Sequence, residues 1–340
     1  MQTIILATDA WRPQINGVVR TLEALAAHTP ALGAEILFLT PEGFPGFPLP
    51  AYKSIRCALP TRAEIARRIE QANPDAIHIA TEGPIGHAVR RFCLGRGLAF
   101  TTSFMTRFPE YISARLPIPE TWSYAFLRRF HAPAAITMVS TQRLRTELEG
   151  RGFQHLGLWA RGVDTALFHP RRALPLALKR PIFVTVGRIA IEKNLTAFLA
   201  LDLPGSKLVI GEGPQEAELK ALFPDAHFVG ALHGDMLAGH MAAADVFVFP
   251  SRTDTFGLVQ LEALASGVPV AAYPVPGPLD VIGDAPVGVL NQDLRQACLQ
   301  ALMVPRDACR AFAERHSWAA SAAQFVGHCR PCASAPREAA

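Results

Sequence analysis

Short apolar runs alternate with amphipathic segments along the first half of the chain. Runs rich in Ile, Leu, Phe or Val that end at turn residues predict buried strands; they lie at 3–8, 35–40, 76–80, 99–102 and 135–140. Between them, apolar residues recur at helical spacing, at 18–28, 61–71 and 86–95. This alternation predicts a parallel sheet with crossover helices.

The same alternation begins again after a basic, proline-containing stretch at 170–181. The second set of strands is predicted at 182–186, 207–210, 227–229, 246–250 and 269–273. With 340 residues, the chain exceeds the size at which one core usually suffices. We predict an α/β protein with two doubly wound, Rossmann-like domains. The predicted parts are 1–170, 171–327 (whose helical segment 306–327 is a candidate to return to the first domain) and a flexible tail, 328–340.

Composition and charge narrow the class of protein. Half of the residues are apolar and 18% are charged, which is typical of a globular protein with a large core. No segment approaches the roughly 18 apolar residues of a membrane span. The six scattered cysteines fit reduced thiols. We therefore expect a cytoplasmic protein.

The net charge of +4 is unevenly placed. Residues 1–170 carry 18 Lys and Arg against 13 Asp and Glu, a net +5. The excess is almost all arginine: Arg62, Arg67, Arg68, Arg90, Arg91, Arg96, Arg128, Arg129, Arg143 and Arg145. These residues are either a solvated surface or a peripheral contact with anionic lipid at the inner face of the cell membrane. Nucleic acid is not an expected partner, because no basic run is interleaved with aromatic residues.

The segment SRTDTFGLVQLEALASGVPV, 251–270, carries the clearest chemistry. Asp254 and Glu262 lie eight positions apart, with a turn-prone step between them and an apolar helical run after it. The first acid is predicted at or before the helix N-terminus and the second inside the helix. Free N–H groups beside a carboxylate suit a polyhydroxylated, anionic ligand such as a nucleotide sugar. A helix that is merely capped by its first acid would show the same spacing.

Three other turns follow predicted strands. Gly187 is followed by Arg188 and Lys193, two cations that can neutralise a diphosphate if they converge, or that are solvated surface charges. A glycine-rich turn, 211–214, contains Gly213 and would bring its backbone near a base or ribose. Asn16 and Gly17 open a helix where the backbone can approach a phosphate or sugar, or form only a cap.

The sequence lacks the motifs of several common classes of enzyme. The chain has no Asp-x-Asp, P-loop, HExxH or GxSxG sequence, and no GxGxxG fingerprint. Zinc hydrolysis, serine hydrolysis, a metal-held nucleotide and a nicotinamide oxidoreductase therefore lose support. We expect no metal and no cofactor other than a nucleotide sugar as substrate.

In this order, the motifs resemble those of the retaining glycosyltransferases of family 4, which have the GT-B fold. The matching segments are TDAWRPQINGVVRTLE, TTSFMTRFPEY, RGVDTALF, VGRIAIEKN, GEGP and the 251–270 segment. The similarity is greatest to the bacterial branch that contains mannosyltransferases and diacylglycerol sugar transferases.

The resemblance implies a role for each matching residue. Arg188 and Lys193 would hold the donor diphosphate, Glu262 the ribose, and Asp254 the hydroxyls of the transferred sugar. The further donor contacts would be Asn16, Gly17, Gly187, Gly213, Phe256, Gly257 and Leu258. Candidate sugar or acceptor contacts are Asp9, Glu82, Met105 and Arg107. The family's mechanism is front-face substitution with retention, in which fixed cations stabilise the leaving diphosphate.

Two positions depart from the family pattern. Asp254 stands where the wider family has Glu, and it is one methylene shorter. Met105 stands where relatives have a histidine that contacts the donor sugar, and methionine cannot donate a hydrogen bond. Met105 marks a changed geometry, a lowered activity, or a tolerated substitution in which Thr106 or Arg107 covers part of the role.

The main functional hypothesis is transfer of a hexose from a UDP- or GDP-linked donor to a membrane lipid such as diacylglycerol. One alternative keeps this chemistry with a soluble or polysaccharide acceptor. Another is a donor-binding homologue with impaired catalysis.

Overall fold

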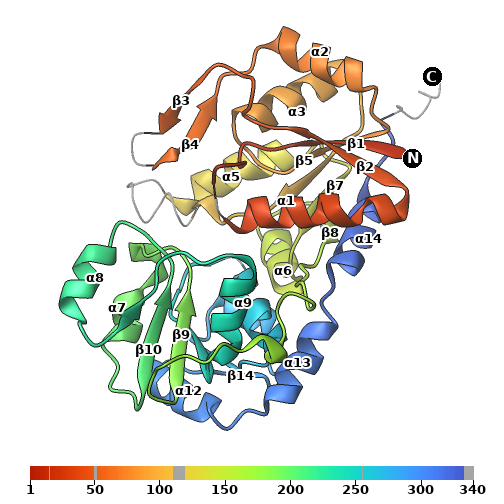
Figure 1. Cartoon of the computed structure of the whole chain (residues 1–340). Helices are drawn as coiled ribbons and strands as arrows, with labels where there is room; N and C mark the ends of the chain where they lie inside the picture. The colour runs from red at the N-terminus through yellow and green to blue at the C-terminus, as the bar shows by residue number, and fades with distance from the viewer. Residues whose placement is uncertain (15, 50–51, 110–118, 255, 333–340) are drawn as a thin grey trace. The chain divides into compact units, whose positions relative to one another are not determined.

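The computed structural model describes residues 1–14, 16–49, 52–109, 119–254 and 256–332. The chain divides into two compact units (Figure 1). Unit 1 contains Met1–Ala160 together with Trp318–Ala340, and unit 2 contains Arg161–Ser317. The predicted boundary after residue 170 therefore lies ten residues beyond the end of the first segment of unit 1.

Unit 1 is built on a six-stranded, fully parallel sheet in the order β2-β1-β5-β6-β7-β8. Its strands are β1 (Gln2–Ala7), β2 (Ala34–Leu39), β5 (Ala76–Ile79), β6 (Thr101–Phe104), β7 (Ile136–Val139) and β8 (Leu156–Leu158). A separate antiparallel pair is formed by β3 (Gly46–Leu49) and β4 (Tyr52–Ala58). The five predicted strands are confirmed, with β6 starting two residues later than expected. The three-residue β8 and the β3–β4 pair were not predicted; β8 is too short to show a period, and β4 (YKSIRCA) contains Lys53 and Arg56 in place of a continuous apolar run.

Helices cover both faces of this sheet, as parallel sheets require. The helices of unit 1 are α1 (Gly17–His28), α2 (Arg62–Ala72), α3 (Pro84–Arg96), α5 (Glu120–His131), α6 (Gln142–Gly150) and α14 (Trp318–His328), with a 3-10 turn, η1 (Pro30–Leu32). Alternate residues of β1 enter different cores. Ile5 packs in the cluster formed with α2 and α3, whereas Ile4 packs in the cluster formed with α1 and α14.

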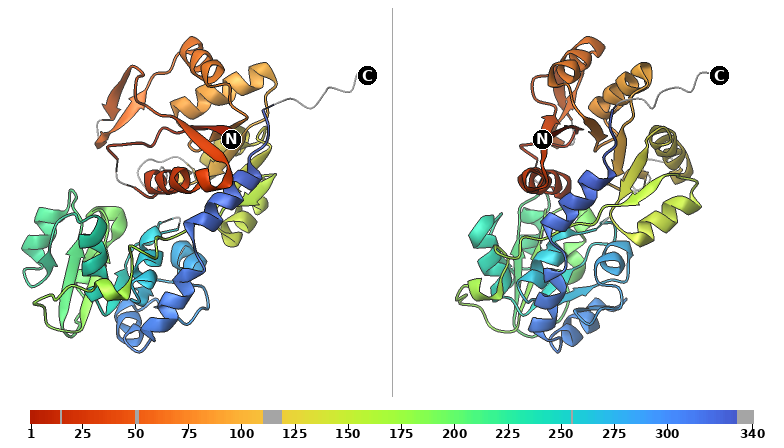
Figure 2. Two further views of the ribbon diagram at one scale, coloured as in Figure 1. Left: turned by 45° about the vertical axis from the view of Figure 1, so that its right-hand side comes forward. Right: turned by 90° about the vertical axis from the view of Figure 1, so that its right-hand side faces the viewer.

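The predicted helical segment 306–327 is two helices in two different units. The first, α13 (Arg306–Glu314), packs against α10 (Leu258–Ala265) in unit 2. The second, α14, packs against α1 in unit 1 (Figure 2), with Phe325 completely buried beside Trp159. Of the tail predicted to be flexible, the described part is attached: Cys332 N donates to Asp75 O over 2.8 Å. Residues 333–340 of that tail lie outside the described residues.

Unit 2 repeats the architecture with the parallel order β11-β10-β9-β12-β13-β14. Its strands are β9 (Ile182–Val186), β10 (Ser206–Ile210), β11 (His227–Phe228), β12 (Val246–Phe249), β13 (Val270–Ala272) and β14 (Gly288–Leu290). Its other helices are α7 (Leu195–Leu199), α8 (Glu216–Leu222), α9 (Gly234–Ala243), α11 (Pro276–Val281) and α12 (Leu294–Ala301), with 3-10 turns η2 (Pro170–Arg172) and η3 (Ile191–Lys193). The five predicted strands are confirmed here too. The strand order reverses direction between β9 and β12, and ligands of open α/β sheets bind at such a switch point.

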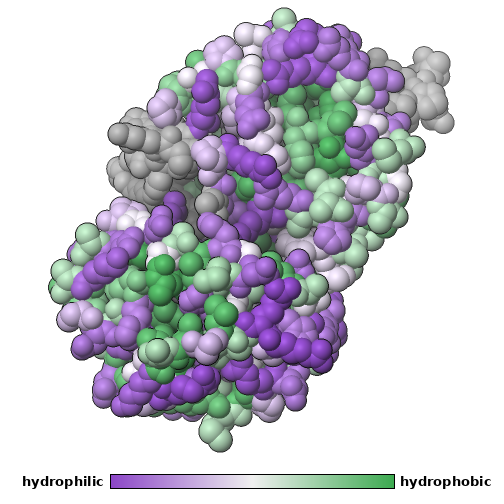
Figure 3. Space-filling view, viewed as in Figure 1, coloured by the Kyte–Doolittle hydropathy of each residue, from purple (hydrophilic) through white to green (hydrophobic). Residues whose placement is uncertain are grey.

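The surface of both units is mixed in polarity. Hydrophilic residues cover much of the visible face, with smaller apolar areas between them (Figure 3). Within the described ranges, no helix has the length and apolar character needed to cross a membrane.

Candidate active site

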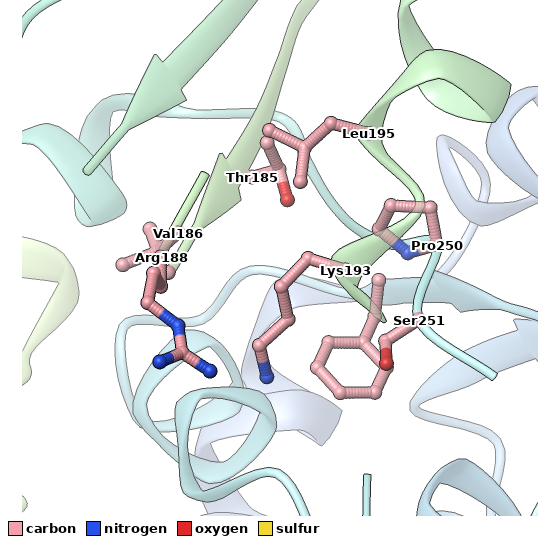
Figure 4. Close-up of a pocket in the computed structure, with 9 residues that line it drawn as sticks. Thr185, Val186, Arg188, Lys193, Leu195, Pro250 and Ser251 are labelled. Carbon is pink, nitrogen blue, oxygen red and sulfur yellow. The ribbon is translucent and has the colours of Figure 1, made fainter. Parts of the chain in front are cut away.

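Two loops meet at the switch point of unit 2. The first leaves β9 at Gly187 and ends at Asn194, and the second leaves β12 at Pro250. Asn194 Nδ2 donates to Pro250 O over 3.1 Å, and Ser251 Oγ donates to Glu192 O over 3.2 Å. These hydrogen bonds join the loops across a small pocket whose lining includes Gly187 and Ser251 (Figure 4). The two loops therefore form one surface.

Four charged side chains lie on this surface. Lys193 Nζ donates to Asp254 Oδ1 over 2.6 Å, and both side chains are mostly buried, at 26% and 16% exposure. The Arg188 guanidinium pairs with Glu192, whose side chain is 9% exposed, while Arg188 itself is 49% exposed. The side chains of Arg188 and Lys193 extend in the same direction in Figure 4. The cluster is formally neutral, and both predicted cations border the same pocket.

Asp254 has one oxygen engaged and one available. Its Oδ2 is buried, and no described residue forms a hydrogen bond with it. A buried acceptor without a donor is unfavourable by about 1–3 kcal/mol. This oxygen is thus suited to accept a hydrogen bond from a ligand hydroxyl.

The start of α10 differs from an ordinary capped helix. Its N-cap is Gly257, at φ +77°, and no side chain of the described residues caps the helix. A Cβ at this position would also lie 2.8 Å from both Gln260 Nε2 and Phe249 Cζ. Asp254 precedes the helix and pairs with Lys193 instead of capping it. The interpretation of the acid pair as a plain capped helix is therefore wrong.

The other predicted residues of the 251–270 segment lie at the start of α10 or inside it. Leu258 is the first residue of α10, and Phe256 O accepts a hydrogen bond of 2.8 Å from Gln260 Nε2. Glu262 lies inside the helix with 8% exposure. Thr255 lies outside the described residues. The order of turn, glycine and helix agrees with the sequence-based expectation.

Gly213 has a packing role that the sequence did not reveal. A Cβ there would lie 2.2 Å from Ile189 O, so only glycine allows the turn after β10 to approach the loop after β9. Gly211 is similar, because its Cβ would lie 1.9 Å from Gly187 O. These glycines let the turn after β10 pack closely against the loop that carries Arg188.

The predicted residues of unit 1 form separate structures. Asn16 caps α1, with Oδ1 accepting from Val18 N and Val19 N at 3.0 Å, and Gly17 begins that helix. Asp9 accepts from Ile85 N at 2.8 Å at the start of α3. Burial raises the pKa of Asp9, although hydrogen bonds from Ile85 N, Thr81 and Gly86 N oppose the rise.

Glu82, Arg107 and Met105 also have partners or packing within unit 1. Glu82 Oε1 lies 3.1 Å from His131 Nε2, with both side chains almost fully buried. Arg107 forms a bidentate pair with Glu147, at 3.1 and 2.7 Å. Burial by itself raises the pKa of Glu147. The hydrogen bonds and charges of Arg107 and Arg151 together outweigh this effect, so the pKa of Glu147 is lowered overall. Met105 packs against the apolar cluster of β1 and α1.

The structure therefore brings together part of the predicted site. Gly187, Arg188, Lys193 and Asp254 meet at the switch point of unit 2, whereas Asp9, Asn16, Gly17, Glu82, Met105 and Arg107 belong to unit 1. Sequence reasoning missed Glu192 and Ser251. Both lie inside the quoted motifs, and the charge of Glu192 between two cations was the available signal. The described residues contain no group of three or more His, Cys, Asp or Glu placed to hold a metal ion.

Comparison with solved structures defines the class of protein. Sucrose-phosphate synthase from Thermosynechococcus elongatus superimposes with a TM-score of 0.79 at 19% identity, covering 96% of this chain and 98% of that one. Two Rossmann-like parallel sheets in this arrangement along the chain define the GT-B fold of glycosyltransferases.

Sequence comparison gives the family. Residues 15–167 match the family model "Glycosyltransferase Family 4", and residues 180–318 match "Glycosyl transferases group 1". A "GDP-mannose-dependent alpha-mannosyltransferase" of Mycobacterium tuberculosis is 29% identical over 84% of this chain and 83% of its own length. An "Alpha-monoglucosyldiacylglycerol synthase" of Streptococcus pneumoniae is 25% identical over 89% and 78%. The chain belongs to glycosyltransferase family 4 and is a glycosyltransferase with a nucleotide-sugar donor.

Proposed function

We propose that this glycosyltransferase moves a hexose, with retention of configuration, from a UDP- or GDP-linked donor to a membrane lipid such as diacylglycerol. The observation that carries the donor half is the charged cluster at the switch point of unit 2. Arg188 and Lys193 border one pocket, and Lys193 holds Asp254 with a buried acceptor oxygen available.

Each residue has a stated part in the proposed chemistry. Arg188 and Lys193 bind the donor diphosphate and stabilise the charge that it gains as the bond to the sugar breaks. Asp254 accepts a hydrogen bond from a sugar hydroxyl and Glu262 accepts from the ribose, which fix the donor's orientation. In front-face substitution the acceptor hydroxyl gives its proton to the leaving diphosphate. These cations supply the positive charge, so the proposal does not require a metal.

The lipid acceptor is supported by the relatives. One has a name that specifies a diacylglycerol glycolipid, and another has a name that specifies GDP-mannose as donor. A soluble or polysaccharide acceptor is the second candidate. It is favoured by arginines of unit 1 that already pair with glutamates, such as Arg67 with Glu64 and Arg96 with Glu70. A donor-binding homologue with impaired catalysis is the third, motivated by Met105.

One experiment separates the three. The purified chain is given radiolabelled UDP-glucose, UDP-glucuronate or GDP-mannose with diacylglycerol vesicles or, in parallel reactions, with soluble sugars and polysaccharides, and thermal shifts are recorded with UDP, GDP and ADP. Labelled lipid of retained configuration from one donor supports the proposal, and Lys193→Ala should abolish it. Label only in a soluble or polysaccharide product supports the second candidate. A nucleotide that raises the melting temperature without any transfer supports the third.

A further inference from the structure

The outward side of α5 exposes large aromatic residues. Trp122 is 72% exposed and Phe126 57%, one helical turn apart, while Tyr124, Leu127 and Phe130 on the same helix are buried. Scattered exposed apolar residues are common, but two large rings stacked along one helix face form a continuous apolar ridge. Tryptophan at this exposure is typical of interfaces between an apolar and an aqueous phase.

Arginines surround this ridge. Arg128 and Arg129 follow on α5, and α3 adds Arg90 and Arg91. Arg90 joins the two helices, with Nε donating to Phe130 O over 2.8 Å and Nη2 to Arg129 O over 2.9 Å. The ring of His87 on α3 contacts Phe126, at 5.4 Å between centroids. Figure 1 shows α3 and α5 as neighbours, and these contacts join their side chains.

Most arginines on these two helices have no carboxylate partner among the described residues; Arg96, at the end of α3, is the exception and pairs with Glu70. Helix α3 contains no Asp or Glu, and α5 contains only Glu120, at its first position. Burial lowers the pKa of Arg90, and the charge of Arg129 lowers it further. Burial lowers the pKa of His87 as well; Arg90 adds to this effect and Glu82 opposes it. No ion pair of Arg90, Arg91, Arg128 or Arg129 with a carboxylate occurs in the described part of the chain. Other helices differ: Glu64 of α2 pairs with both Arg67 and Arg68.

A hollow beside α5 offers a place for an anionic group. It is lined by Arg128 and Arg129 from the helix and by Gly152 and Gln154 from the turn after α6. Arg128 Nη1 donates to Arg151 O over 3.0 Å, which fixes the guanidinium at the edge of the hollow. A guanidinium held in this way has further N–H groups that match the oxygens of a phosphate.

We propose that one face of α3 and α5 docks on the surface of a bilayer rich in anionic lipid. This α3–α5 face consists of Arg91, Leu94, Trp122, Phe126, Arg128 and Arg129. Trp122 and Phe126 would lie at the level of the headgroups, and the arginines would contact lipid phosphates. Charge complementarity selects this occupant, because α3 and α5 present exposed arginines and apolar side chains and contain only one acid, the half-buried Glu120. The inference rests on the proposed lipid acceptor, which requires the chain to reach a membrane.

The test measures vesicle binding separately from catalysis. Full-length chain is sedimented with phosphatidylglycerol vesicles and with phosphatidylcholine vesicles at low and high salt. Binding to phosphatidylglycerol alone, weakened by salt, is expected. Arg128→Gln with Arg129→Gln should lower the partition coefficient about 30-fold, and Trp122→Ser with Phe126→Ser about tenfold. The matched controls are Arg67→Gln with Arg12→Gln, which remove the same charge from exposed ion pairs outside α3 and α5, and Met303→Ser in unit 2. The controls should change binding less than twofold.

Fluorescence gives a second readout. Trp122 should shift to shorter wavelength on vesicles and be quenched by brominated lipid, whereas the fully buried Trp159 should not respond. A circular-dichroism spectrum and a thermal transition of unit 1 that equal those of the wild type show that each variant is folded. Vesicle binding that is equal in the face variants and the controls would overturn the α3–α5 face while leaving the lipid acceptor intact. If the wild-type chain binds no vesicles, or binds only a protein partner, the proposed docking face and the proposed lipid acceptor are both wrong. The proposed donor site is not affected by that result.

Discussion

Lys193 and Asp254 are 61 positions apart in the chain, and their charged atoms lie 2.6 Å apart. Arg188, beside them, pairs with Glu192. In this state each cation already has a carboxylate, so in the proposed donor complex the diphosphate would compete with both acids for the same N–H groups. Glu192 has little exposure and holds Arg188 through its Nη2, while about half of the Arg188 side chain stays exposed. The two ion pairs therefore hold Arg188 and Lys193 in position, and they also reduce the positive charge that these side chains offer to a ligand.

Removing either cation should weaken nucleotide binding. Arg188→Ala and Lys193→Ala are each expected to lower the affinity for UDP or GDP about 10- to 100-fold, because a charge-assisted hydrogen bond contributes about 1.5–3 kcal/mol. Each change also leaves a carboxylate without its cation next to the phosphates. Calorimetric titration measures the affinity, with Lys220→Ala as control, since Lys220 is exposed on α8 and pairs with Glu216. Unchanged affinity in both site variants would refute the diphosphate contact.

At the scale of elements, the turn into α10 positions the acid of the cluster. Gly257 adopts the left-handed conformation and packs against Phe249 at the end of β12. This close approach lets the chain reverse from the strand into the helix within a few residues. Asp254 is therefore presented to Lys193, and the first N–H groups of α10 are left without a side-chain cap. A helix start of this kind favours a negatively charged ligand.

A side chain at Gly257 should damage this turn. Gly257→Ala is expected to destabilise the chain by about 2–4 kcal/mol, from the left-handed conformation and from overlap with Phe249 and Gln260. Gly95→Ala is the matched control, because Gly95 lies within α3 with open space around its Cβ. There alanine should stabilise by up to about 1 kcal/mol. Urea denaturation followed by circular dichroism measures both, and equal midpoints would contradict the packing argument.

At the scale of the whole molecule, the chain returns to its first unit at the end. Helix α14 covers one face of the unit 1 sheet together with α1, and the Nε1 of Trp159 donates to Ser321 Oγ over 3.0 Å. Unit 1 is therefore made from two distant segments of sequence. Its core is complete only when residues after 317 have been added.

A change in α14 should act on unit 1 alone. Phe325→Ala removes a completely buried ring and is expected to destabilise unit 1 by about 3–5 kcal/mol, with nucleotide affinity in unit 2 retained. Ala323→Ser, at an exposed position of the same helix, should have little effect. Thermal unfolding with and without UDP or GDP separates the two transitions. Loss of nucleotide binding with an unchanged unit 1 transition would place α14 in the wrong unit.

Much of the fold was predictable because strand and helix periods are local properties. Ten strands were placed from apolar runs and turn residues alone, and both sheets followed from their alternation with helices. The donor motifs were equally visible, since Gly187, Arg188 and Lys193 lie within seven residues and Asp254 and Glu262 within nine. The break between α13 and α14 was not visible, because both helices show the same period and only packing separates them.

The sequence by itself determined the class of fold, the family and the candidate residues for the proposed donor site. Only the tertiary structure decided which charges pair, because Lys193 and Asp254 meet through the adjacency of β9 and β12 and not through their spacing. It also decided that Asn16 is occupied as a cap and that Arg107 is bound to Glu147. The physical reason is that periodicity and motifs are properties of neighbouring residues, whereas burial and ion pairing depend on distant segments of the chain packing together.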